Sequence, residues 1–122
     1  MEASRAERLL VVLIILHSVA VGLALLAVPE WALRFGGWAE TGPSFFPRQA
    51  GVFHFLLALG YGLEFFRCRT VTLLVAAKAT AFVFLSAATV LLWPPPWIVP
   101  FSATTDGLMG LAVVLLHRRA GR

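Results

Sequence analysis

Charged residues are scarce in this chain of 122 residues, since only 13% of them are Asp, Glu, Lys or Arg. Lysine, aspartate and cysteine occur once each, as Lys78, Asp106 and Cys68. A single cysteine excludes an intrachain disulfide, and no CxxC or HxxxH spacing indicates a metal site. The sequence also lacks a nucleophile placed beside a base and a phosphate-binding glycine loop. We therefore predict no metal site and no enzymatic activity.

Apolar residues, in contrast, make up 60% of the sequence. A soluble domain of this length could not bury so many of them. A membrane-spanning helix needs about 20 mostly apolar residues, and the sequence predicts four such helices, at about 8–28, 47–66, 71–93 and 97–117. The first stretch is longer than the apolar part of a secretory signal, so we expect it to be retained. The predicted fold is one all-α domain over residues 1–122, an integral membrane four-helix bundle of up-down-up-down order.

The arginines predict how this bundle lies in the membrane. Most of them fall before the first helix, between the second and third, and after the fourth: Arg5, Arg8, Arg67, Arg69, Arg118, Arg119 and Arg122. Only Arg34 and Arg48 fall on the other side. The positive-inside rule then places both termini in the cytoplasm. Because topology explains the net charge of +4, we expect no nucleic-acid partner.

The opposite side is rich in aromatic residues and proline, and the segments "PEWALRFGGW" and "WPPPW" carry all four tryptophans. Aromatic residues of this kind gather at membrane surfaces. Pro29 can open a short helix, Glu30 and Arg34 have the i,i+4 spacing of an ion pair, and Gly36 with Gly37 can end the helix. We predict a short interfacial helix between the first two spans.

The single lysine stands in "LLVAAKATAF", in the middle of an apolar run. A charge at the centre of a membrane helix costs about 2.5 to 3.5 kcal/mol, so Lys78 and Asp106 should face inward and pair with each other. At 1.5 Å per residue, Lys78, Asp106, His17 and His54 lie roughly 11 to 18 Å from the cytoplasmic end of their helices. These four residues form the predicted intramembrane polar cluster, and Gly107 and Gly110 beside Asp106 favour close helix packing.

Two interpretations of this polar cluster stay open. The ion pair can be structural, locking two helices in register, with each histidine bound to a backbone carbonyl or a hydroxyl. Alternatively the cluster forms a ligand pocket or a proton path, or His17 and His54 hold a haem. Secondary candidates are Glu64, Tyr61 and Arg48, and Glu64 lies near the cytoplasmic end, where it can reach water or Arg67.

The layout of the chain resembles that of small bacterial membrane proteins of the DoxX-like kind. The resemblance lies in "PEWALRFGGW" after the first helix, "FFPRQAGVFHFLLALGYGLEF" for the second, a lysine in the third and an aspartate in the fourth. It implies a four-helix fold in the bacterial inner membrane and, for some members, a role as accessory subunit of a quinone-linked oxidoreductase.

These observations lead to three functional hypotheses. The first is a non-enzymatic accessory or scaffold subunit with a polar centre, whose partners are the lipid bilayer and other membrane subunits or a second copy of the chain. The second is a redox subunit that binds quinone or haem, and the third is a small proton-coupled transporter. The first hypothesis needs no cofactor.

Overall fold

A computed structural model of the chain describes residues 5–120, and this part of the chain is helical without a strand. The all-α prediction is thereby confirmed. In chain order the elements are α1 Arg5–Ala27, α2 Pro29–Phe35, α3 Phe45–Leu63, a π-helical turn η1 Glu64–Cys68, α4 Thr72–Leu91 and α5 Ile98–Arg119. Arg122 of the predicted basic end lies outside the described residues.

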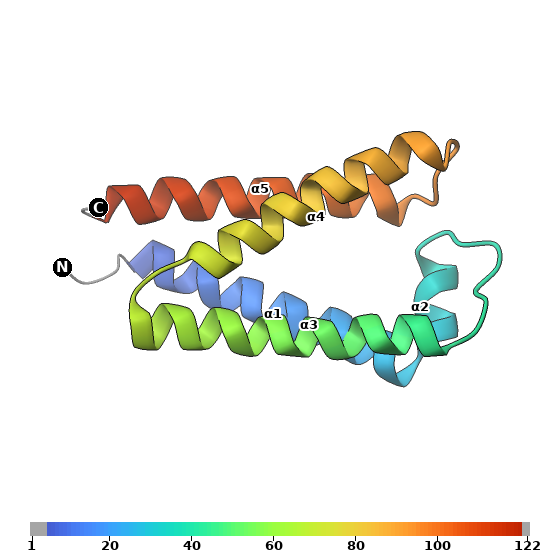
Figure 1. Ribbon diagram of the computed structural model, residues 1–122, viewed down its shortest axis with the longest axis horizontal. Helices are drawn as coiled ribbons and strands as arrows, with labels where there is room; N and C mark the ends of the chain where they lie inside the picture. Colours follow the sequence, from blue (N-terminus) through green and yellow to red (C-terminus); the bar gives the residue numbers. More distant parts are fainter. Residues whose placement is uncertain (1–4, 121–122) are drawn as a thin grey trace.

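The four long helices form two pairs, α1 with α3 and α4 with α5. The two helices of each pair run antiparallel and pack along most of their length, whereas contacts between the pairs are few (Figure 1). In Figure 1 the pairs lie close together at the end that carries both chain termini and separate toward the end that carries α2. The middle of the molecule is therefore held mainly by contacts within each pair.

Glycines allow both pairs to pack closely. In the first pair, a Cβ atom at Gly22 would lie 2.8 Å from the carbonyl oxygen of Gly51, and one at Gly51 would lie 2.7 Å from the carbonyl oxygen of Gly22. In the second pair, a Cβ atom at Gly107 would lie 2.7 Å from the ring of Phe82. Small residues drive helix association in lipid because they let the backbones approach. The expectation of close packing beside Asp106 is confirmed at Gly107.

An apolar core joins the two pairs at the end that carries the termini. Its buried members come from α1, α3, η1, α4 and α5 and from the residue before α4: Val11, Ile14, Tyr61, Phe65, Val71, Leu74 and Val113. Tyr61, a secondary candidate for the functional site, is 2% exposed and belongs to this core. Its position therefore indicates a packing role.

The predicted short helix is present as α2, with Pro29 in its first turn and Gly37 in a left-handed conformation, φ +98°, just after its end. The Glu30–Arg34 ion pair was a wrong prediction for this helix. Arg34 instead donates from Nη1 to the carbonyl oxygen of Ala39, at 3.3 Å. The exposed arginine finds a backbone acceptor in the loop that follows α2, where a carbonyl is fixed in place, whereas a surface ion pair has to order two long side chains.

This short helix is bound to the loop between α4 and α5. The indole Nε1 of Trp97 donates to the carbonyl oxygen of Phe35 at 2.7 Å, and the amide of Ile98 donates to the carbonyl oxygen of Gly36 at 3.1 Å. The rings of Phe35 and Trp97 also meet edge to face, with 5.6 Å between their centroids. The two helix pairs are thus tied together at this end too, through α2.

Three helices in the described part of the chain, α1, α4 and α5, are long and apolar enough to cross a membrane. The fourth predicted span, α3, is not among them. Its first turns contain Arg48 and Gln49, and His54 follows one turn later, which lowers the mean hydropathy of the helix.

Candidate functional site

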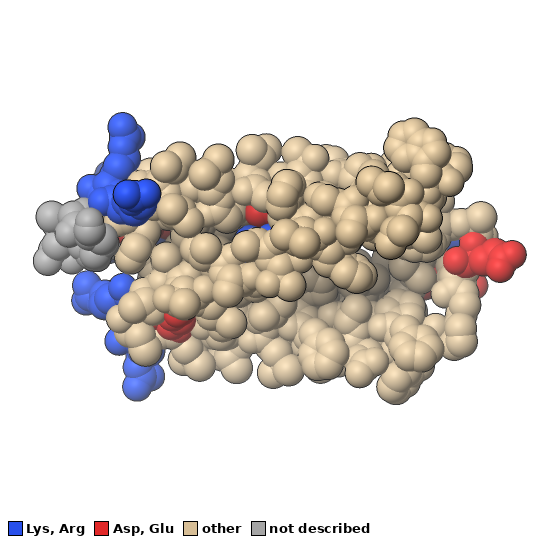
Figure 2. Space-filling view, turned by 45° about the horizontal axis from the view of Figure 1, so that its top comes forward, with Lys and Arg blue, Asp and Glu red and all other residues tan. Residues whose placement is uncertain are grey.

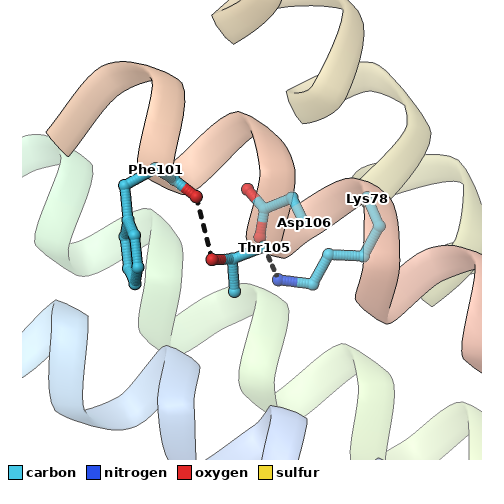
Figure 3. Close-up of polar contacts among 4 residues, drawn as sticks. All are labelled: Lys78, Phe101, Thr105 and Asp106. Atoms are coloured by element: carbon cyan, nitrogen blue, oxygen red, sulfur yellow. Dashed lines mark hydrogen bonds and ion pairs between the residues drawn. The ribbon is translucent and has the colours of Figure 1, made fainter. Parts of the chain in front are cut away.

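The predicted ion pair is present between α4 and α5. Lys78 Nζ lies 2.9 Å from Asp106 Oδ1, and the two side chains are 7% and 14% exposed. Figure 3 shows the lysine side chain reaching from α4 across to the carboxylate on α5. Gly110 allows this contact, because a Cβ atom there would lie 3.1 Å from Lys78 Cβ. The pairing prediction is therefore confirmed.

Hydroxyl groups near the ion pair are bound within their own helices. Thr105 Oγ1 donates to the carbonyl oxygen of Phe101 at 2.8 Å, and Thr104 Oγ1 donates to that of Pro100 at 3.0 Å (Figure 3 shows the first). Backbone bonds of this kind satisfy a hydroxyl that has no water around it. The ion pair consequently has no further hydrogen-bond partner in the part of the chain that the structure describes.

The two histidines of the predicted cluster lie on the other helix pair, His17 on α1 and His54 on α3. Within residues 5–120, no described hydrogen bond or ion pair joins either imidazole to Lys78 or Asp106. His17 is exposed, whereas His54 is half-buried and its Nδ1 is buried without a hydrogen-bond partner among residues 5–120. Ligation of a haem by this pair stays a prediction. In the same part of the chain, no three His, Cys, Asp or Glu side chains lie close enough to hold a metal ion.

A groove of about 490 Å³ runs between α4 and α5 beside the ion pair. We name it the α4–α5 groove. Both Lys78 and Asp106 line it, and its other walls are mainly apolar: Val75, Ala79, Phe82, Leu108, Leu111 and Val114. Ala79, Phe82, Leu108 and Leu111 are exposed, so the groove is open to the surroundings of the helix pair.

A second buried polar contact was missed by the sequence analysis. Glu7 Oε2 on α1 lies 2.6 Å from His117 Nδ1 on α5, and the carboxylate side chain is 1% exposed. The side chain of His117 is 20% exposed. The contact joins the first and last helices of the described chain, at the end where the two pairs come together.

A pattern in the sequence could have indicated this contact. Glu7 lies on the buried face of α1 that continues through Val11, Ile14, Ser18 and Gly22. A residue at helical spacing from this apolar stripe is expected to point inward, whatever its charge. The predicted first helix begins at about residue 8, so Glu7 fell outside it.

Basic side chains gather at the end of the molecule that carries both termini, and acidic ones are visible at the opposite end (Figure 2). The described arginines of the predicted cytoplasmic side stand at the ends of α1, η1 and α5 or just beside them: Arg5, Arg8, Arg67, Arg69, Arg118 and Arg119. Arg48, a secondary candidate, is exposed on α3 and lies away from these groups in the sequence. No described contact joins Arg48 to the ion pair.

Glu64 has a local structural role. Both of its carboxylate oxygens accept the backbone N–H of Leu73, at 2.8 and 3.0 Å. Leu73 is the second residue of α4, and the first amides of a helix have no partner within it. Glu64 therefore caps α4 from η1, and no described ion pair joins it to Arg67.

Replacing Glu64 with alanine is expected to destabilise the protein by about 1 kcal/mol, the usual effect of losing a helix N-cap. The free energy of unfolding in detergent measures this effect. Glu40→Ala serves as a control, because Glu40 is exposed and no described hydrogen bond involves it. Equal stability of the two variants would contradict the capping role.

No protein-family model, curated protein or solved structure matches this chain. Its resemblance to DoxX-like proteins stays a prediction. The function is therefore argued from the helices, the ion pair and the groove.

Proposed function

We propose that this protein is an integral membrane protein of the bacterial inner membrane, with α1, α3, α4 and α5 as an up-down-up-down four-helix bundle and both termini in the cytoplasm. In this proposal it acts as a non-enzymatic accessory or scaffold subunit. Three helices of sufficient length and apolarity support the membrane location. The gathering of arginines at one end supports the orientation.

The observation that carries the scaffold role is the Lys78–Asp106 ion pair. Its two charges neutralise each other and are 7% and 14% exposed, so the outer faces of α4 and α5 carry no exposed charge apart from Arg118 and Arg119 at the end of α5. Large apolar side chains are exposed on those faces, among them Phe84, Leu91, Leu108 and Leu111. Such a surface suits contact with lipid and with the helices of a membrane partner.

Affinity purification from the native membrane in mild detergent tests this role. We expect at least one other membrane protein to co-purify in a fixed ratio, as identified by mass spectrometry. An unrelated tagged protein of the same membrane is the control for non-specific capture. A chain that purifies alone, with the mass of a monomer, would contradict the scaffold role.

A second candidate function is a redox subunit that binds quinone or haem. The specific observation in its favour is the buried Nδ1 of His54, which has no partner in residues 5–120 although buried polar atoms are normally hydrogen-bonded. Absorption spectroscopy and lipid extraction of the purified protein test this candidate. A Soret band, or bound quinone, that is lost in His54→Ala would support it. A colourless protein without quinone would rule it out.

The proposed orientation predicts that Cys68 faces the cytoplasm. Cys68 is exposed and stands between Arg67 and Arg69. A membrane-impermeant thiol reagent should therefore leave it unlabelled in intact spheroplasts and label it after the membrane is opened. The matched control is Glu40→Cys in a Cys68→Ala background, which should be labelled from outside. The reverse pattern would invert the proposed topology.

A further inference from the structure

The α4–α5 groove has the size and lining of a small-molecule site. Ligand sites are typically about 300 to 1,000 Å³, mostly apolar and provided with a few polar groups, and this groove of about 490 Å³ falls in that range. Its polar groups include the buried ammonium group of Lys78 and the carboxylate of its partner Asp106, whose side chain is 14% exposed. The walls are apolar and partly exposed, so a lipid-soluble molecule can enter from the side.

The ion pair does not use all of its hydrogen-bonding capacity. A lysine ammonium group has three N–H donors, and Lys78 has one described hydrogen bond, to Asp106 Oδ1. The other carboxylate oxygen, Oδ2, accepts no hydrogen bond from the residues that the structure describes. Figure 3 shows this second oxygen turned away from the ammonium group. One acceptor and two donors are thus available beside the groove.

This combination selects the chemistry of the ligand. A hydroxyl group can donate to Asp106 Oδ2 and accept from Lys78 Nζ, whereas a ketone or an ether can only accept. A carboxylate would be repelled by Asp106 and an ammonium group by Lys78. We propose that the α4–α5 groove binds a lipid-soluble alcohol, whose hydroxyl group contacts the Lys78–Asp106 pair and whose apolar chain lies against Phe82, Leu108 and Leu111. The proposal goes beyond the scaffold role, since it requires no partner protein.

Photolabelling of the full-length protein in lipid vesicles tests the proposal. The probe is a long-chain primary alcohol with a diazirine in its chain, and the matched probe is its methyl ether. The ether can still accept a hydrogen bond but cannot donate one. Loss of a hydrogen bond to a charged group weakens binding about tenfold or more, so the alcohol should label peptides of α4 and α5 about tenfold more than the ether.

A pair of variants locates the labelling without disturbing the ion pair. Ala79 lines the groove, and Ala79→Leu should fill it and abolish the preference for the alcohol. Ala87 is also exposed on α4 but does not line the groove, so Ala87→Leu should keep the preference. Circular dichroism of both variants verifies that they are folded.

Two outcomes would overturn the proposal. Equal labelling by the alcohol and the ether would show that the groove does not recognise a hydroxyl group. Equal loss, or equal retention, of the preference in Ala79→Leu and Ala87→Leu would place the alcohol outside the groove. Capture of a membrane partner is measured separately, so failure of the scaffold role and failure of this ligand site are distinguishable.

Discussion

Lys78→Ala is expected to lower the free energy of unfolding by about 3 to 5 kcal/mol, because it leaves the carboxylate of Asp106 without a counter-ion inside an apolar helix pair. Asp106→Ala should have an effect of the same kind on Lys78. Protonation of Asp106 or loss of the proton from Lys78 reduces the effect in the respective variant. The double variant should lose less stability than the sum of the two single variants, since no lone charge remains.

Detergent unfolding of the four proteins in this double-mutant cycle gives the coupling energy. Thr80→Ala, next to the pair in sequence but exposed, is a control that should not couple with Asp106→Ala. Additive effects of Lys78→Ala and Asp106→Ala would contradict the contact. Replacing Lys78 and Asp106 together with a well-packed apolar pair then tests whether the ion pair is only structural. If it is, the apolar variant should fold and still bind its partner.

Gly51→Ala is expected to destabilise the pairing of α1 with α3 by about 1 to 3 kcal/mol, the usual effect of overpacking. The added methyl group would lie 2.7 Å from the carbonyl oxygen of Gly22 and 3.0 Å from the amide nitrogen of Leu26. Both atoms belong to the backbone, so no side-chain rotation can make room. The two helices would have to move apart along the closest part of their contact.

Gly62→Ala provides the matched control on the same helix. A Cβ atom at Gly62 would meet only Ile15 Cδ1, at 3.7 Å, which is ordinary contact. This substitution should be neutral, or stabilise the helix by up to about 1 kcal/mol through its higher helix propensity. Thermal unfolding in detergent compares the two variants. Equal stability of Gly51→Ala and Gly62→Ala would show that the close approach does not limit packing.

The ion pair could be predicted from the sequence because lysine and aspartate occur once each and both stand inside apolar runs. A lone lysine and a lone aspartate, each at the centre of an apolar helix, have few other ways to avoid lipid. The helices were predictable for a similar reason, since long apolar runs and the proline in the first turn of α2 determine them locally. The α4–α5 groove was not predictable, because it depends on how far apart Phe82, Leu108 and Leu111 are held by two helices that cross.

Contacts at helix ends were harder to predict. Glu64 caps a different helix from its own, and this requires the η1 turn to bring it beside Leu73. Glu7 is buried because the two helix pairs meet at the end where its helix begins, a feature of tertiary packing. Glu30 and Arg34 had suitable spacing, yet the arginine bonds to a loop carbonyl that the spacing rule does not consider.

The contact between Glu7 and His117 also bears on the order of events during synthesis. The two residues are 110 positions apart, so the carboxylate is made long before its imidazole partner. At about 5 to 20 residues per second, the interval is roughly 5 to 20 s. During that time the growing chain already contains α1 but cannot complete the contact that joins it to α5. A chain interrupted before α5 therefore lacks the imidazole partner of the Glu7 carboxylate near the start of α1.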